Sequence, residues 1–176
     1  MSPAPERGPI ARHLAADHAR LDALLRRAIA RPGVLDREPF DAFRAGLLHH
    51  IAVEEKLLLP AARAARGGEP LELARRLRID HGALTSLLVP TPSPELVAEL
   101  RSILAPHNLA EEAPEGLYAT CDALLAAGAA ALVARMAAYP PVRLHGYRDG
   151  PGVHRTAASA LAASARQLEP RPPRAR

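Results

Sequence analysis

Two short motifs that combine a histidine with a glutamate recur in this sequence of 176 residues. His50 is followed four residues later by Glu54, and His107 is followed in the same way by Glu111. On an α-helix, residues four apart lie on one face, one turn from each other. An imidazole and a carboxylate presented together are ligands that iron, manganese and zinc accept, so the two motifs point to metal chemistry.

A second repeated motif places a histidine within a stripe of leucines. His18 and His81 each follow an aspartate, Asp17 and Asp80, and each has leucines at helical spacing before and after it. These motifs alternate along the chain with the two histidine–glutamate pairs. The sequence therefore reads as two helical hairpins of similar design, each with its ligands in the same order.

The elements that must position these residues are helices. Few aromatic residues and many alanines and leucines favour helices over strands. Apolar spacing and helix breakers predict helices over residues 10–30, 39–65, 70–88, 94–112, 117–136 and 156–167, with a kink at Pro60 and a helix start at Ser93 and Pro94. Residues 94–136 are expected to form one interrupted helix or two collinear ones.

Burying the leucine stripes of two helical hairpins predicts an all-α fold, an up-down antiparallel four-helix bundle over residues 1–138. The histidines and the first glutamate of each pair would point into its interior. Six buried ionisable groups are costly without partners. A dinuclear metal site removes that cost, because each metal takes two imidazoles and the two carboxylates bridge the pair. The predicted ligands are His18, His50, Glu54, His81, His107 and Glu111.

Iron is the metal that a histidine-rich dinuclear site suits best, and manganese and zinc suit the same donors. The single cysteine, Cys121, excludes a cysteine-based zinc or iron–sulfur site. No glutamate stands three residues before any histidine, so the pattern of ferritin-like di-iron proteins is absent. Taken singly, each histidine has an ordinary interpretation as a core residue. Only their joint pattern favours metal binding.

The remaining polar residues near these motifs leave alternatives open. Glu55 and Glu112 lie about 100° further round the helix than their neighbours and are expected to point to the side. Asp17 and Asp80 either hydrogen-bond a ligand imidazole or are solvated helix charges.

Several other residues are not predicted to be metal ligands. Phe43 and Tyr118 fall on the ligand faces, where they either pack the core or line a small-molecule pocket. Cys121 is expected to be a buried small residue. The remaining histidines are not expected to be ligands: His13 and His49 are expected to be exposed, and His145 and His154 lie in the C-terminal part.

The positive charge is concentrated at the C-terminus. Residues 139–176 carry seven arginines and two acidic residues, whereas residues 1–138 are close to neutral. We therefore expect a basic extension rich in proline, alanine and arginine, partly disordered and with its end at 169–176 unfolded, and no nucleic-acid partner. The sequence shows no secretory signal and no membrane-spanning run, which predicts a cytoplasmic protein without a membrane partner. It favours no particular oligomeric state.

In combination, these motifs resemble the hemerythrin-like, or HHE cation-binding, domain over roughly residues 10–136. The resemblance implies an up-down four-helix bundle with two non-haem irons joined by an oxo or hydroxo bridge, and it implies the same six ligands. The oxygen-carrying hemerythrins have a further histidine on the third helix, where Leu77 and Thr85 stand here. The resemblance therefore implies an iron with positions left for water, a bridge or a ligand.

Three functions follow from this interpretation. The first is a di-iron protein that senses, binds or scavenges O2, NO or peroxide in a stress response, or that buffers iron. The second is a redox enzyme that reduces peroxide or NO or repairs iron centres. The third is an interaction module with a degenerate metal site.

Overall fold

The computed structural model describes residues 7–169 of the chain. Over that range the chain is all-helical and contains no β-strand, as the sequence predicts. The expected disorder at 169–176 falls, apart from Glu169, outside the described residues. The elements are α1 (Pro9–Ala28), α2 (Arg37–Val53), the π-helical turn η1 (Glu54–Leu58), α3 (Leu59–Ala65), α4 (Ala74–Leu87), α5 (Pro94–Glu112), α6 (Leu117–Leu124), α7 (Ala129–Ala137) and α8 (Ala157–Gln167).

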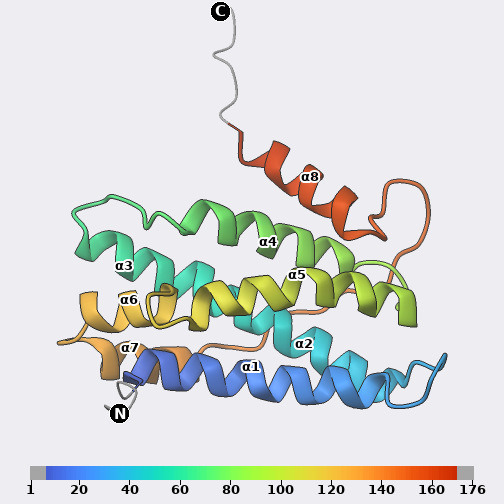
Figure 1. The fold of residues 1–176 in the computed structure, drawn as a ribbon, viewed down its shortest axis with the longest axis horizontal. Helices are drawn as coiled ribbons and strands as arrows, with labels where there is room; N and C mark the ends of the chain where they lie inside the picture. Colours follow the sequence, from blue (N-terminus) through green and yellow to red (C-terminus); the bar gives the residue numbers. More distant parts are fainter. Residues whose placement is uncertain (1–6, 170–176) are drawn as a thin grey trace, which may run out of the picture.

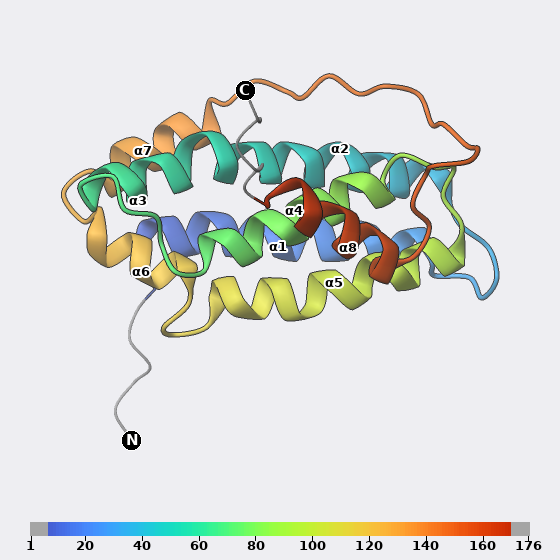
Figure 2. The same ribbon diagram turned by 90° about the horizontal axis from the view of Figure 1, so that it is seen from above.

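The long helices lie along one axis and pack side by side (Figure 1). Helix α1 packs against α2 and also contacts α5, while α4 packs against α5 (Figures 1 and 2). Helices α2 and α3 are joined through η1 without a break. The predicted start of the fourth helix is confirmed, because Pro94 opens α5 and the Ser93 hydroxyl accepts a hydrogen bond from the amide of Leu96.

The core consists of two apolar clusters with a polar layer between them. Along α1, Leu14 belongs to one cluster and Leu21 to the other, and His18 lies between them. Along α4, Leu77 and Leu84 flank His81 in the same way. The leucines before and after each histidine must both be buried, so the histidine between them is buried as well.

The predicted kink at Pro60 takes the form of a one-turn π-helix just before it. Proline has no amide hydrogen to donate to the carbonyl of Lys56, and its ring crowds that carbonyl. The amide of Leu59 instead bonds the carbonyl of Glu54, five residues back. This wider turn begins at Glu54 itself, and π-turns inside α-helices are frequent at functional sites.

The prediction of one helix over residues 117–136 is wrong. The chain breaks after Leu124, and α7 runs at 105° to the helical stretch Pro94–Leu124. By turning back, α7 covers α1 and η1 and buries Leu132 and Met136. A straight continuation would take these two side chains away from α1 and η1, so burial favours the bend.

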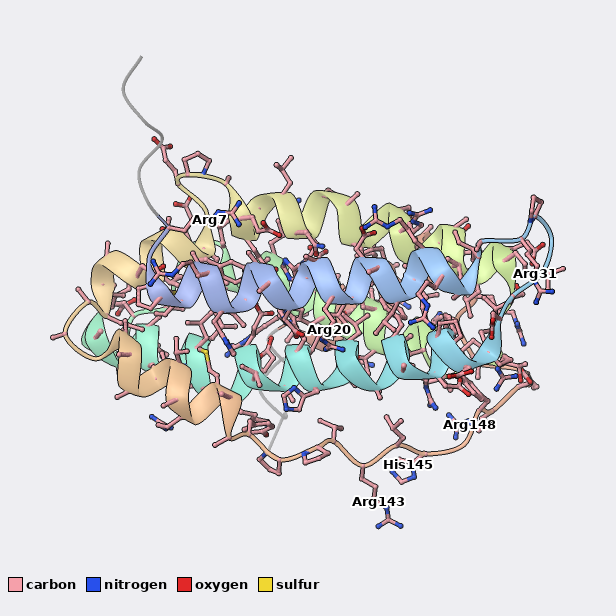
Figure 3. The ribbon with its side chains drawn as sticks, turned by 90° about the horizontal axis from the view of Figure 1, so that it is seen from below. Arg7, Arg20, Arg31, Arg143, His145 and Arg148 are labelled. Atoms are coloured by element: carbon pink, nitrogen blue, oxygen red, sulfur yellow. The ribbon has the colours of Figure 1, made fainter. Side chains whose placement is uncertain are left out.

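The segment between α7 and α8 runs along the outside of the helices beside α2 (Figures 2 and 3). The ring of Tyr147 lies under the guanidinium groups of Arg37 and Arg44, at 4.6 and 4.3 Å from the ring centre. The amide of Arg148 donates a hydrogen bond to the carbonyl of Val89. In contrast, Arg143 and His145 project away from the helices in Figure 3.

The predicted short helix in the extension is confirmed as α8, which packs on α4. Ala160 of α8 is fully buried and joins the apolar cluster that contains Leu84. Gly82 lets α8 approach closely, because a Cβ there would lie 2.2 Å from the hydroxyl oxygen of Ser164. Part of the extension therefore contributes to the core.

We expect Ala160→Arg to destabilise the protein without changing its metal content. The long charged side chain cannot fit between α8 and α4, at a cost of about 1–3 kcal/mol, which lowers Tm by roughly 2–12 °C in a chain of this length. Thermal unfolding measures the effect. Ala162→Arg, on the exposed side of α8, is the matched control. Equal Tm values for the two variants would show that α8 does not dock on α4 in solution.

Among the described residues, no single helix has the length and apolar character needed to cross a membrane. One bent pair, Pro94–Leu124 with Ala129–Ala137, meets the test by length and composition alone.

Candidate metal centre

The six side chains that the sequence predicts as metal ligands converge in the polar layer of the core. All six are buried, and the two glutamates are completely shielded from solvent. They come from α1, α2, η1, α4 and α5, and they are His18, His50, Glu54, His81, His107 and Glu111. The structure thus brings together every predicted ligand.

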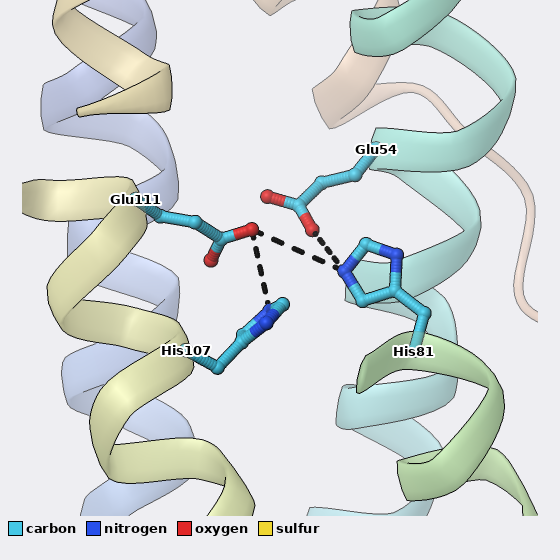
Figure 4. Close-up of side chains that lie close together, drawn as sticks. All are labelled: Glu54, His81, His107 and Glu111. Atoms are coloured by element: carbon cyan, nitrogen blue, oxygen red, sulfur yellow. Dashed lines mark ion pairs between the residues drawn. The ribbon is translucent and has the colours of Figure 1, made fainter. Parts of the chain in front are cut away.

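One half of the centre is formed by His81 and His107 with both glutamates (Figure 4). The Nε2 atom of His81 lies 3.1 Å from Oε2 of Glu54, and Nε2 of His107 lies 3.2 Å from Oε1 of Glu111. Oε1 of Glu111 also lies 4.0 Å from Nε2 of His81. The donor atoms of these four residues all lie within 4.8 Å of one another, close enough to hold one cation.

The other half is formed by His18 and His50 with Glu111. The Nε2 atoms of the two histidines are 3.0 Å apart. Oε2 of Glu111 lies 3.5 Å from Nε2 of His18, and Oε1 of Glu54 lies 3.4 Å from Nε2 of His50. Each glutamate therefore turns one oxygen to each histidine pair, which is the arrangement that two bridging carboxylates require.

Each histidine is oriented by a carboxylate from another helix. Asp17 accepts from Nδ1 of His50 at 3.0 Å, and Asp80 accepts from Nδ1 of His107 at 3.2 Å. This settles the alternative that the sequence leaves open for the two aspartates. An imidazole whose Nδ1 hydrogen is donated outward presents the Nε2 lone pair to the centre, which suits a metal ligand.

The second glutamate of each motif, Glu55 or Glu112, orients a histidine in the same way. Oε1 of Glu55 accepts from Nδ1 of His81 at 2.8 Å, and Oε1 of Glu112 accepts from Nδ1 of His18 at 2.9 Å. The sequence predicts only that these glutamates point to the side. Their role is missed because each contact joins two helices, although the doubled glutamate in both motifs is a signal that could have revealed it.

Arginines support three of these four outer carboxylates. Arg20 lies 2.7 Å from Asp17, and Arg78 lies 3.2 Å from Glu55. Arg7 lies 3.1 Å from Glu112. Arg7 and Arg20 are both on the face of the molecule seen in Figure 3. The arginines help to keep these carboxylates in place, so that they hold the imidazoles.

The burial of opposite charges shifts the pKa values across the centre. Burial opposes the charge on His50, but Glu54 and Asp17 outweigh it and raise the His50 pKa to about 10. Burial also opposes the charge on His107, but Asp80 and Glu111 raise its pKa to about 9. Burial and the neighbouring His50 lower the pKa of His18. Without metal, protons on His50 and His107 therefore place positive charge in the centre.

A metal cation fits the residues that are present. Among the described residues, three buried atoms of the centre have no hydrogen-bond partner, namely Oε2 of Glu54, Nε2 of His81 and Oε1 of Glu111. All three belong to one half of the centre. A cation between them would satisfy all three atoms, and imidazole with carboxylate is a donor set for iron, manganese or zinc.

The residues expected to stay outside the centre do so, with one exception. Cys121 is buried, and burial raises the pKa of its thiol to about 12, as befits an inert core residue. His13 and His49 are half-buried rather than exposed, because α7 and the chain that follows it lie beside them, and Nε2 of His49 donates to the carbonyl of Tyr139. His154 contacts Ser159, far from the centre.

Tyr118 is the exception, because it belongs to the centre and not only to the apolar core. Its hydroxyl lies 2.7 Å from Oε1 of Glu54 and 3.1 Å from Oε2 of Glu111. Burial, followed by these two carboxylates, raises the Tyr118 pKa well above its ordinary value. The start of α6 can approach the end of α5 this closely only because residue 116 is a glycine. A Cβ at Gly116 would lie 2.6 Å from the carbonyl oxygen of Ala110.

A cavity of about 200 Å³ reaches the centre at His18. Its wall is mostly apolar, with two charged side chains among the lining residues, and it includes Phe43, which thus both packs the core and lines a pocket. Asn108, the residue after His107, also lines it, and the side-chain oxygen of Asn108 is buried without a hydrogen-bond partner among the described residues. The cavity can admit a molecule of a few atoms to the histidine layer.

Comparison with known proteins adds one match. The sequence model of the hemerythrin HHE cation binding domain matches residues 9–138, which include all six predicted ligands. Neither the curated proteins nor the solved structures contain a match.

Proposed function

Because the chain belongs to the hemerythrin HHE cation-binding domain family, we propose that its centre holds two non-haem iron ions and senses, binds or scavenges O2, NO or peroxide. The observation that carries the proposal is the convergence of four imidazoles and two carboxylates in one buried layer. The donor set also suits manganese or zinc, and iron is the metal that matches this many imidazoles best.

The arrangement proposed for the helices is the up-down antiparallel four-helix bundle. Helix α1 would form the first helix of the bundle, α2 with α3 the second, α4 the third and α5 with α6 the fourth. This arrangement explains why ligands separated by up to 93 positions, from His18 to Glu111, reach one layer.

In the proposed centre, His18 and His50 would hold one iron, His81 and His107 would hold the other, and Glu54 and Glu111 would serve both. When bound, a pair of ferrous ions supplies electrons that O2, NO or peroxide can accept. The chain's own contribution is to fix the imidazoles through Asp17, Asp80, Glu55 and Glu112, and to exclude bulk water with the apolar clusters on both sides.

The cavity beside His18 is the proposed route for the small molecule. Its mostly apolar wall favours uncharged diatomic gases. The side-chain oxygen of Asn108, which has no hydrogen-bond partner among the described residues, can accept a hydrogen bond from peroxide or water. Large substrates do not fit a cavity of about 200 Å³.

The test is to load the metal-free protein with Fe(II) without oxygen and to follow its visible absorption as O2, NO or hydrogen peroxide is added. We expect a fast change with at least one of them. Ala105→Trp, at the wall of the cavity, should slow this change several-fold because the indole narrows the route. Leu109→Trp, on the same helix but exposed and outside the cavity wall, should leave the rate unchanged.

The same titration separates the alternatives. A spectrum that returns when the gas is removed indicates a binder or sensor, and consumption of many equivalents in the presence of a reductant indicates a redox enzyme. An iron-loaded protein that responds to none of the three molecules would overturn the proposed function. A chain that takes up no metal would favour an interaction module.

A further inference from the structure

The hydroxyl of Tyr118 makes more contacts than a phenol can satisfy. It lies within 2.7–3.4 Å of four atoms of the centre, which are Oε1 of Glu54, Oε2 of Glu111 and Nε2 of His18 and His50. The phenol has a single hydrogen, and ionised carboxylates only accept hydrogen bonds. At most one of the two glutamates can therefore receive it, and the other short oxygen–oxygen contact needs a different explanation.

The position of this hydroxyl completes the smaller of two donor groups. The group around His81 and His107 has four donor residues, whereas the group around His18 and His50 has three. The Tyr118 oxygen lies 3.1, 3.4 and 3.1 Å from the donor atoms of His18, His50 and Glu111. Ligands at about 2.0–2.2 Å from one metal ion are about 3 Å apart when they stand at right angles. The spacing is thus that of neighbouring donors around one cation.

Only one half of the centre has this phenol. Tyr118 follows Glu111 by seven residues, and the residue seven after Glu54 is Ala61. The two halves agree in their histidines, their bridging glutamates and the carboxylates that orient the histidines. They differ where Tyr118 stands, and there Gly116 allows the chain to turn back against the carbonyl groups of Ala110 and Glu111.

We infer that Tyr118 is a further protein ligand of the metal position formed by His18, His50 and Glu111. The two metal positions are therefore chemically different, one with a phenol oxygen donor and one without. On coordination, the bond from oxygen to hydrogen is replaced by a bond from oxygen to metal, and the proton leaves to the solvent. This inference rests on the metal centre of the proposed function and not on which molecule the centre binds.

The test uses the full-length protein loaded with Fe(III). A phenolate bound to Fe(III) gives a charge-transfer band in the visible region, and excitation into that band enhances the ring vibrations of the bound tyrosine in the resonance Raman spectrum. We expect both signals in the wild type. Tyr118→Phe, which removes one oxygen atom, should abolish both while iron remains bound. Tyr139→Phe is the matched control, because the Tyr139 hydroxyl makes no hydrogen bond among the described residues, and it should keep both signals.

A wild-type protein that holds two Fe(III) ions without tyrosine ring vibrations would overturn the inference and leave the proposed function standing. Persistence of the band in Tyr118→Phe would overturn it as well. If Tyr118→Phe fails to fold, the wild-type Raman spectrum alone decides. A protein that shows the band but is unreactive toward O2, NO and peroxide would retain Tyr118 as a ligand and overturn the proposed function instead.

Discussion

Replacing Glu54 and Glu111 together by glutamine should abolish stable metal binding and leave a folded protein. Each carboxylate turns one oxygen to each histidine pair, so each glutamate would serve both of the proposed metal positions. Glutamine keeps the size of the side chain but offers one weak neutral oxygen and no charge. Iron content measured by elemental analysis should fall from about two ions per chain to nearly none.

The matched control for this variant is Glu69→Gln with Glu115→Gln, which removes the same two charges from exposed positions. We expect the control to bind iron like the wild type. Circular dichroism should show that the helices of both variants are intact, because the apolar clusters on either side of the centre are untouched. A Glu54→Gln/Glu111→Gln protein with wild-type iron content would show that the metal is held elsewhere.

Metal loading should stabilise the protein strongly. The centre requires four buried histidines and two buried glutamates to sit together, and only the folded state can assemble them. At a free metal concentration about 1,000 times Kd, the gain is about 4 kcal/mol, which corresponds to a rise in Tm of roughly 8–16 °C for a chain of this size. Thermal unfolding with Fe(II) or Zn(II) added to metal-free protein measures it.

The same binding should release protons. His50 and His107 have pKa values of about 10 and about 9 in the metal-free protein, so both are protonated at neutral pH. A metal needs them neutral, and binding therefore expels their protons and tightens as the pH rises from about 6.5 to about 8.5. Calorimetry in buffers of different ionisation enthalpy measures the release. No rise in Tm together with no proton release would contradict the assignment of the centre.

The sequence could predict that these segments are helices and which face of each helix is buried, because both are local properties. The spacing of His50 and Glu54, and of His107 and Glu111, places each pair on one face whatever the rest of the chain does. The leucines around His18 and His81 fix the buried side of their helices. From these residues alone, the all-helical class and the six converging side chains follow.

Contacts between helices are not local, and here prediction from the sequence fell short. Glu55 and Glu112 were expected only to point to the side, yet they hold His81 and His18 across helix boundaries. Asp17 had two equally good interpretations until the position of His50 on the neighbouring helix was known. The rotation and axial offset of two packed helices depend on side chains from both, so no single stretch of sequence determines them.

The sequence by itself determined the donor atoms of this centre and the face of the helix on which each donor stands. It also predicted a disturbance of the second helix at Pro60, which removes the amide that a regular helix would use and which the structure shows as a π-helical turn. Only the tertiary structure decided that α7 bends back by 105°, that α8 packs on α4, and that Tyr118 reaches His18 and Glu111. The reason is that burial of apolar surface is shared among many elements, so the path of the chain after Glu112 is set by what the rest of the molecule leaves uncovered.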